Sequence, residues 1–266
     1  MFDPMQNAAM LWTGGKDSSM ALYEADQNGY CVRCLVTFAP PEPNFLAHPL
    51  GFIKMQAQAL ALPHYVLPIS APFEKSYETS LCRLRDELGI TCVVTGDIAE
   101  VNGAPNWIRE RSRPVGMNVH TPLWKRDRNV LLGQFLDRGF KARFSCVNTR
   151  WLDENWIGRE LNNSAIVELR TIRERTGLDL CGEEGEYHTL VSDGPRFTQS
   201  IDIRSYSKRV SGSLAYMEIH KSVLFDHAAD RLPRKNRDRQ QVPQNTPRKE
   251  RGTGGLRSIS AARKPV

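Results

Sequence analysis

A short apolar run that leads into a glycine pair and a helix constrains the fold of this chain more than any other stretch. Residues 8–12 are continuously apolar, as is typical of a parallel strand covered on both faces. Two glycines follow, and residues 18–28 have a helical pattern that ends at a further glycine. A helix N-terminus presents unpaired N–H groups and the positive end of the helix dipole. The stretch Trp12–Ser18 therefore predicts an anion-binding loop, and phosphate suits such a loop.

The residue types in this loop favour phosphate. Glycine readily adopts positive φ and lets N–H groups approach phosphate oxygens closely. Lys16 supplies a positive charge and Ser18 a hydroxyl, while Asp17 caps the helix or orients Lys16. The spacing differs from the Walker A pattern, which disfavours a kinase-like or GTPase-like protein. From this stretch alone, the alternative is a tight strand–helix turn that binds nothing.

Apolar runs and helical patterns alternate through the first half of the chain, which predicts strand–helix units and a parallel sheet. Ligands of such sheets bind at the carboxyl ends of the strands. We therefore expect the glycine loop, Thr37–Ala39 and Gly96-Asp97 to converge on one crevice. The predicted strands are 8–12, 32–38, 64–69, 91–97 and 119–124, and the predicted helices are 18–28, 50–61, 73–88, 106–115 and 128–138.

The second part of the chain has a different pattern and predicts a smaller α+β domain packed on the first. We place the nucleotide domain at 1–139 and the smaller substrate or catalytic domain at 140–228, with an active site where the two meet. Its predicted elements are a strand at 141–147, helices at 152–161 and 165–176, and strands at 189–191, 197–203, 207–211 and 216–222, with a loop rich in glycine and glutamate before the last four.

The basic character of the chain belongs to its end. The formal net charge is +6, yet eleven Lys or Arg residues against three acids lie beyond residue 229, so the preceding part is slightly acidic. Residues 229–266 have few apolar side chains, which predicts a disordered basic tail. The alternative for this tail is weak contact with nucleic acid.

Other features of the composition indicate a cytoplasmic protein. No apolar run is long enough to cross a membrane, and the N-terminus lacks the pattern of a signal peptide. The six cysteines are scattered rather than spaced as a disulfide framework, so we expect free thiols. Cys31 and Cys34 fall on a predicted strand, where positions three apart point to opposite faces, which argues against a metal or redox pair.

Two motifs together resemble a known family. The run Thr13-Gly14-Gly15-Lys16-Asp17-Ser18 after the first strand resembles the pyrophosphate loop (PP-loop) of the adenine nucleotide alpha-hydrolase superfamily. The run Cys181–Val191, followed by Asp193-Gly194-Pro195, resembles the second-domain motif of the diphthine–ammonia ligase family (diphthamide synthase domain). Supporting segments are Thr95–Ile98, Pro122–Trp124, Gly139–Ala142 and Gly158–Leu161, and the resemblance spans about residues 8–203.

The resemblance implies a Rossmann-like (HUP-type) parallel-sheet nucleotide domain with a second, smaller α+β domain. It also implies an ATP-dependent, AMP-forming ligase that uses Mg²⁺. In such an enzyme a carboxylate is adenylated with release of pyrophosphate, and ammonia or an amine then displaces AMP to leave an amide. The acceptor carboxylate, on a protein or elsewhere, the nitrogen donor and the oligomeric state stay open.

The resemblance also implies roles for individual residues. Glu183 and Glu186 are expected to bind Mg²⁺, to accept ammonium or to take a proton from ammonia, while a structural role is the alternative for Asp97 and His188. The expected nucleotide contacts are Trp12, Thr13, Gly14, Gly15, Lys16, Asp17, Ser18, Thr37, Phe38, His48 and Gly96; the expected catalytic residues are Lys16, Asp97, Glu183, Glu186 and His188; and the candidate metal ligands are Asp17 and Asp97.

The identity of the acceptor is the property of the family that the resemblance supports least well for this chain. Members that amidate diphthine on elongation factor 2 have Gly-Ala-Ile and Glu-Gly-Gly-Glu-Tyr-Glu-Thr where this chain has Gly96-Asp97-Ile98 and Glu183–Thr189. The chain looks more like a bacterial branch, in which diphthamide is not expected. Two further hypotheses are a tRNA-thiolating enzyme, with Cys181 as a candidate nucleophile, and a nucleotide sensor without chemistry.

Overall fold

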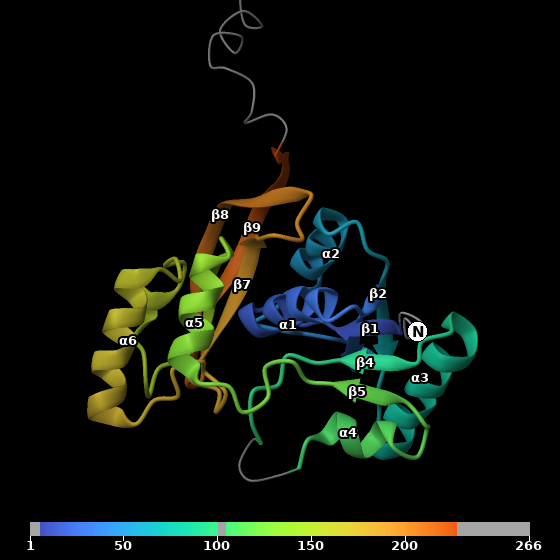
Figure 1. Cartoon of the computed structure of the whole chain (residues 1–266). Coiled ribbons are helices and arrows are strands. Elements are labelled where there is room, and N and C mark those ends of the chain that lie inside the picture. Colours follow the sequence, from blue (N-terminus) through green and yellow to red (C-terminus); the bar gives the residue numbers. More distant parts are fainter. Residues whose placement is uncertain (1–5, 101–104, 228–266) are drawn as a thin grey trace, which may run out of the picture. The chain divides into compact units, whose positions relative to one another are not determined.

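The first half of the chain forms a parallel five-stranded sheet in the computed structural model (Figure 1), which describes residues 6–100 and 105–227. The strand order is β3-β2-β1-β4-β5, and all four neighbouring pairs are parallel. The order reverses beside the central strand β1, where ligands of open α/β sheets bind. The strands are β1 (Asn7–Leu11), β2 (Cys31–Ala39), β3 (His64–Pro68), β4 (Cys92–Val94) and β5 (Asn118–His120).

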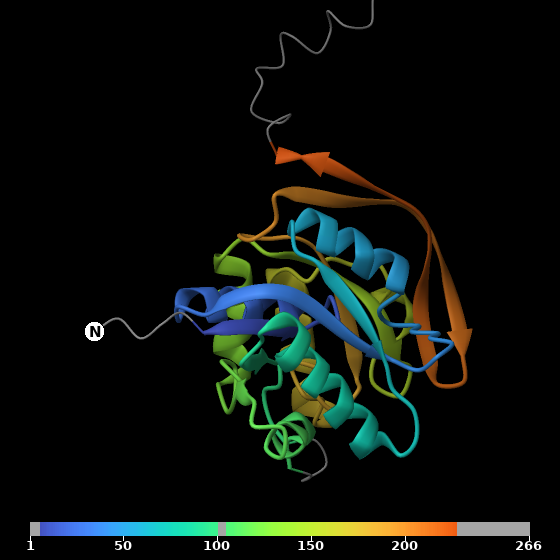
Figure 2. The ribbon, with the colours of Figure 1, turned by 90° about the vertical axis from the view of Figure 1, so that its right-hand side faces the viewer.

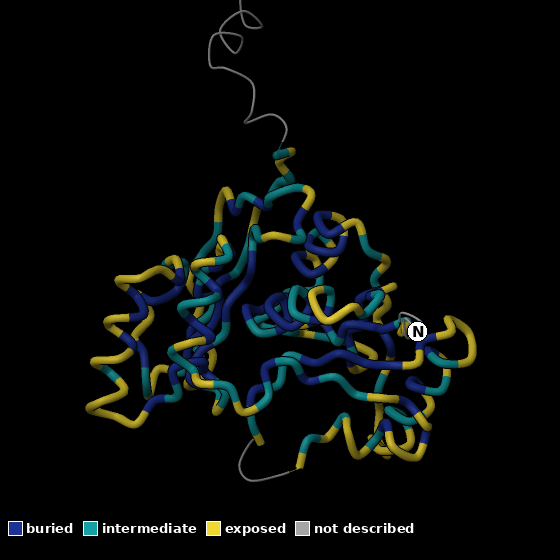
Figure 3. The backbone as a smooth tube through the Cα atoms, viewed as in Figure 1, coloured by how far each residue is buried: buried dark blue, intermediate teal, exposed yellow. Residues whose placement is uncertain are grey.

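Helices cover both faces of this sheet because its strands are apolar on both sides. Ala8 and Met10 pack into the hydrophobic cluster that includes α1 and α2, whereas Ala9 packs into a second cluster with α3. Figure 3 shows the resulting burial of the central strands. The helices are α1 (Lys16–Gln27), α2 (Leu50–Ala59), α3 (Phe73–Leu88), α4 (Trp107–Ser112) and α5 (Arg128–Asp137).

The second part of the chain forms an antiparallel four-stranded sheet in the order β7-β6-β9-β8, accompanied by a helix. The parallel sheet and this α+β part together confirm the predicted fold class. Figure 2 shows β8 and β9 as a long hairpin, and Thr198 at its base donates a hydrogen bond to the Ala59 carbonyl at the end of α2. The elements are β6 (Lys141–Asn148), η1 (Glu154–Trp156), α6 (Asn163–Thr176), β7 (Tyr187–Asp193), β8 (Gln199–Ser211) and β9 (Leu214–Asp226).

The two sheets share a hydrophobic core. One cluster of buried side chains runs from Met10 and Met20 to Leu190 and Val191 of β7. A backbone hydrogen bond also joins the two parts, because the Val191 N–H donates to the Gly14 carbonyl at 3.0 Å. Strand β7 of the second sheet therefore lies directly against the loop that follows β1.

Several predicted boundaries need correction. The predicted helix at 152–161 is wrong: only a short 3₁₀ turn forms, and the chain then passes through Gly158 at a φ of +85°. The predicted strands 197–203 and 207–211 are parts of one bulged strand, β8. The predicted strands 91–97 and 119–124 end earlier, at Val94 and His120. After Val94 the chain leaves the sheet, and residues 95–97 form part of the edge of a cavity.

Other predictions have different outcomes. All six cysteines are free thiols, as expected. In the part of the chain that the structure describes, no helix has both the length and the apolar character to cross a bilayer. The division at residue 139 stays a prediction, and the predicted tail from residue 229 lies outside the described residues.

Candidate functional site

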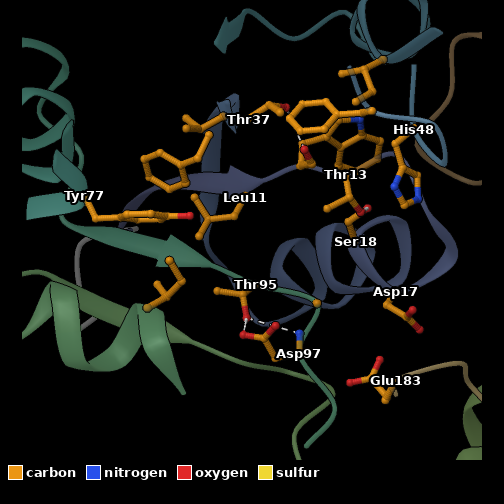
Figure 4. Close-up of a pocket in the computed structure, with 17 residues that line it drawn as sticks. Leu11, Thr13, Asp17, Ser18, Thr37, His48, Tyr77, Thr95, Asp97 and Glu183 are labelled. Carbon is orange, nitrogen blue, oxygen red and sulfur yellow. Dashed lines mark hydrogen bonds between the residues drawn. The ribbon is translucent and has the colours of Figure 1, made fainter. Parts of the chain in front are cut away.

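A cavity of about 440 Å³ opens at the carboxyl ends of β1, β2 and β4. The expected convergence is confirmed, because the loops after these three strands all contribute to its wall. Figure 4 shows Tyr77 at one end of the cavity and Asp17, His48 and Glu183 at the other. The lining residues that were expected from the sequence are Trp12, Thr13, Asp17, Ser18, Thr37, Phe38, His48, Gly96, Asp97 and Glu183.

A buried glutamine fixes the conformation of the glycine loop. Gly14 has a φ of +82°, and a Cβ on it would lie 2.2 Å from Oε1 of Gln56, so only glycine fits. The Gln56 side chain is fully buried. It donates Nε2 to the carbonyls of Gly14 (2.8 Å) and Val191 (2.7 Å), while its Oε1 accepts from Nε1 of Trp12 (3.1 Å). This single amide therefore holds β1, the glycine loop and β7 together.

The N-terminus of α1 is packed closely by a residue of β7 and by the loop that follows β4. The Lys16 N–H donates to the Thr189 hydroxyl at 3.0 Å, so β7 satisfies one of the free N–H groups of the helix. A Cβ on Gly96 would lie 2.7 Å from the Ser18 backbone nitrogen, so the loop after β4 approaches the helix as closely as glycine allows. On the side that faces the cavity, the Thr13 hydroxyl donates a hydrogen bond to the Ser18 hydroxyl at 3.2 Å.

Lys16 does not line the cavity. Its side chain is buried, and Nζ lies 2.7 Å from the Asp17 carboxylate and also donates to the Cys181 carbonyl. The ring of Tyr187 lies beneath Nζ, 5.2 Å away at its centroid. Burial, the largest single influence, lowers the pKa of Lys16, but the Asp17 carboxylate together with Tyr187 and Cys181 outweighs it, and the pKa is raised well above its ordinary value. The ammonium group is therefore charged and links α1 to the glutamate-rich loop.

The two glutamates predicted to be catalytic face opposite ways. Glu183 lines the cavity, and its Oε2 accepts a hydrogen bond from the Ile98 N–H at 3.3 Å. Glu186 is buried, and its two oxygens accept from the N–H groups of Asp179 (2.9 Å) and Glu184 (3.0 Å). Glu186 therefore closes the turn of the loop, whereas Glu183 points to the space in front of it.

The environment of Glu183 alters its acidity. Burial, and then the nearby Asp17 carboxylate, raise the pKa of Glu183 to about 7, and Lys16 opposes this shift. A carboxyl with a pKa near neutrality exchanges protons readily at physiological pH. Glu183 can therefore serve as a proton acceptor in this cavity.

Asp97 lies on the cavity wall and is oriented by two neighbours. Its Oδ2 accepts from the Thr95 hydroxyl and from Nδ2 of Asn106, each at 2.6 Å (Figure 4 shows the first of these contacts). Asn106 also caps α4, since its side chain accepts from the Arg109 N–H. The Asp97 carboxylate is therefore fixed and still borders the cavity.

The end of the cavity away from the acids is apolar and aromatic. Leu11, Val36 and Ile108 line it, together with Phe38, whose ring lies 4.5 Å from that of Tyr77. The Thr37 hydroxyl is turned inward, where it donates to the Trp12 carbonyl at 2.7 Å and lies 2.9 Å from Nε2 of His64. This end suits a flat aromatic group, whereas the opposite end suits a polar one.

Sequence reasoning named most of the cavity wall and missed several of its supports. Of the expected residues, Gly14, Gly15, Lys16, Glu186 and His188 do not line the cavity but pack behind it. Their predicted contacts with nucleotide or substrate stay predictions. The residues that were missed are Gln56, Tyr77, Thr95 and Thr189. Thr95 and Thr189 had a sequence signal, because they lie inside segments that carry the family resemblance, whereas Gln56 and Tyr77 had none.

Comparisons with known proteins match almost the whole described chain. The profile of the diphthamide synthase N-terminal domain matches residues 5–119, and that of the diphthamide synthase C-terminal domain matches residues 127–225. Among curated relatives, the diphthine–ammonia ligase of Danio rerio is 24% identical over 73% of this chain and 84% of its own length. The diphthine–ammonia ligase of Homo sapiens is 24% identical over 74% of this chain and 82% of its own length.

Two further matches differ in how much of each chain is aligned. The diphthine–ammonia ligase of Schizosaccharomyces pombe is 25% identical over 80% of this chain but only 39% of its own length. A solved structure, described as a predicted subunit of tRNA methyltransferase from Methanocaldococcus jannaschii, aligns with a TM-score of 0.39 and 17% identity, covering 72% of this chain and all of that one.

Proposed function

The chain belongs to the diphthamide synthase family, and we propose that it is an ATP-dependent ligase that adenylates a carboxylate and converts it to an amide. The observation that carries the proposal is the cavity beside the glycine loop, whose two ends differ in character: one end is aromatic and the other contains Glu183. Its volume of about 440 Å³ lies within the usual range for small-molecule sites.

In the proposed orientation of ATP, the adenine lies against Phe38 and Tyr77, and the phosphates lie at the glycine loop. The Thr13 and Ser18 hydroxyls border this part of the cavity at the start of α1, whose dipole favours an anion. An oxygen of the acceptor carboxylate attacks the α-phosphorus, and the bond to the bridging oxygen of pyrophosphate breaks. A carboxylate needs this step because its own oxygen is a poor leaving group.

In the second step, ammonia attacks the acyl carbon and AMP leaves with its electron pair. The nitrogen must lose a proton, and we assign Glu183 as the group that takes it, because it borders the cavity with a pKa raised to about 7. Glu186 we assign to holding the loop that presents Glu183, since both of its oxygens bind backbone N–H groups.

For Mg²⁺ we propose Asp97 as the protein ligand. Of the two candidates, Asp17 is already paired with Lys16, whereas Asp97 borders the cavity with its orientation fixed by Thr95 and Asn106. Within residues 6–100 and 105–227, no group of three or more His, Cys, Asp or Glu side chains could hold a metal on its own. Asp97 would hold the ion together with the phosphates of the substrate, and the ion would supply positive charge for the departing pyrophosphate.

The competing hypotheses have less support. A thiolating enzyme needs a reactive cysteine, but Cys181 is buried and its burial raises the pKa of the thiol. A sensor without chemistry does not require a carboxyl with a near-neutral pKa in the cavity. For the acceptor, the names of the relatives point to diphthine, and the differences at Gly96-Asp97-Ile98 and His188 favour another carboxylate of the same class.

An ATP–pyrophosphate exchange assay tests the proposal. Labelled pyrophosphate enters ATP only when a carboxylate is adenylated reversibly, so the assay is screened across candidate carboxylates, including a purified elongation factor. Exchange with at least one acceptor, followed by AMP release on addition of ammonium, is the expected result. Formation of ADP and phosphate in place of AMP and pyrophosphate would overturn the proposal.

A further inference from the structure

The charges around the cavity are unfavourable for a triphosphate. Asp17, Asp97 and Glu183 line it, and no Lys or Arg is among the described lining residues. The ammonium of Lys16 is turned away to the Cys181 carbonyl. Bringing phosphates beside carboxylates without a positive charge is costly in a partly desolvated site. A positive charge from the protein at the glycine loop would therefore add to the effects of Mg²⁺ and of the α1 N-terminus.

Two imidazoles lie at this point. His48 precedes α2 and lines the cavity, and His188 is the second residue of β7. Their ring centroids are 5.2 Å apart and their planes meet at 75°. A Cβ on Gly15 would lie 3.3 Å from Nε2 of His48, so the edge of this ring rests against the glycine loop. Figure 4 places His48 at the same end of the cavity as Asp17.

Their surroundings keep both rings neutral before a ligand binds. Burial, and then His188 and Lys16, lower the pKa of His48 to about 3, opposed by a hydrogen bond to the Thr189 backbone. Burial and Lys16 lower the pKa of His188 to about 4. The Cys146 residue paired with His188 in the sheet is neutral, since burial raises the pKa of its thiol to about 11. An anion at the loop favours the protonated ring, and it acts against burial, which is the larger influence on both pKa values, as well as against Lys16.

We propose that His48 and His188 act as one proton-accepting phosphate site: when the pyrophosphate part of ATP binds, the pair takes one proton from solvent and donates a charged hydrogen bond to a phosphate oxygen. The proton returns to solvent when pyrophosphate leaves. This inference rests on the proposed function, and it adds a coupling between proton uptake and phosphate binding.

Calorimetric titration of the full chain with inorganic pyrophosphate tests this inference. Titrations at pH 7 in buffers of different ionisation enthalpy give the number of protons taken up, which linkage ties to the change in pKa. The variants are His48→Gln and His188→Gln. The matched control is His220→Gln, because His220 lies on the exposed β8–β9 hairpin with its ring against the Ser207 hydroxyl.

The expected result is that the parent protein and His220→Gln take up about one proton more than either variant of the pair. Affinity for pyrophosphate should fall about tenfold in the variants at neutral pH, as loss of a charged hydrogen bond predicts. If a variant does not fold, NMR titration of the histidine ring signals of the parent protein decides. When pyrophosphate binds, one ring of the pair should take the shifts of a protonated imidazole, or the two rings should each take part of that change.

The contrary outcomes are distinct. Pyrophosphate binding with the same proton count in all four proteins, or with unshifted histidine signals, would overturn the histidine pair and leave the ligase proposal intact. Absence of binding of both ATP and pyrophosphate to the parent protein would overturn the proposed function and this inference together.

Discussion

The glycine loop and the glutamate loop meet at one cavity, yet they are held in different ways. The glycine loop, Thr13–Ser18, is fixed from outside by Gln56 and by the Thr189 hydroxyl. The glutamate loop, Cys181–Glu186, is fixed from inside, because Glu186 binds the backbone of its own turn. Lys16 is the link between the two loops.

The difference shows that a residue type within a motif does not reveal its role. Glu183 and Glu186 are three positions apart with the same side chain, but one borders the cavity and the other is an internal support. The four predictions that follow test which loop each residue serves, beginning with the largest expected effect.

Removal of Lys16 should have the largest effect, because its ammonium group links the glycine loop to the glutamate loop on the two sides of the site. Lys16→Ala should lower ATP–pyrophosphate exchange at least about a hundredfold, because misplacement of both loops by about 1 Å costs a factor of this size. The exchange assay with an active carboxylate measures this, and circular dichroism checks the fold. Unchanged exchange would show that Lys16 supports neither loop in catalysis.

Glu186→Ala tests the internal support of the glutamate loop. It leaves the part-buried N–H groups of Asp179 and Glu184 without their acceptor and removes a buried side chain, which should reduce the free energy of unfolding by about 1–3 kcal/mol. Urea denaturation measures the change. Glu184→Ala is the matched control, because that side chain is exposed and should change stability by less than about 0.5 kcal/mol. Equal stability of the two variants would contradict the structural role of Glu186.

Gln56→Ala tests the external support of the glycine loop. The change exposes the Val191 carbonyl and Nε1 of Trp12 to a cavity without partners, so we expect a loss of about 2–3 kcal/mol and weaker pyrophosphate binding. Gln58→Ala, on the exposed face of the same helix, is the control for both measurements. A lower free energy of unfolding with unaltered pyrophosphate affinity would show that Gln56 stabilises the fold without contributing to phosphate binding.

The acidity of Glu183 predicts a smaller, pH-dependent effect. Its pKa is raised to about 7 from an ordinary value of 4.5, so between these values the folded state binds more protons than the unfolded state. Stability should therefore fall as pH rises from about 5 to about 7, by about 1–2 kcal/mol once partial exposure is allowed for. The Glu183→Gln variant should lack this loss. Parallel pH profiles of unfolding free energy for the two proteins would refute the raised pKa.

The parts of the fold that follow from local pattern were predictable. The buried run before the glycine pair, the helix after it and the order of strand–helix units follow from apolar periodicity and helix end signals. The helix at 152–161 failed because its apolar residues, including Trp156 and Ile157, are buried from an irregular segment rather than from one face of a helix. Periodicity alone does not distinguish these cases.

For the site, the sequence indicated which loops converge but not which way each side chain faces. Gln56 lies in a predicted helix with no motif around it, and its role depends on a contact with β7, 135 residues further along the chain. The orientation of Lys16 depends equally on the position of Cys181. Such directions are set by tertiary packing between the two sheets, which one-dimensional patterns do not encode.

The bonds from Thr189 and Val191 to the glycine loop also limit how the chain can be divided and recombined. A nucleotide-binding half transplanted from a relative would bring its own glycine loop but would meet a foreign β7. Chimaeras that exchange β7 and the segment before α1 together should retain nucleotide affinity, whereas a junction placed between them should lose it. The smallest exchangeable cassette in this protein is thus discontinuous in sequence.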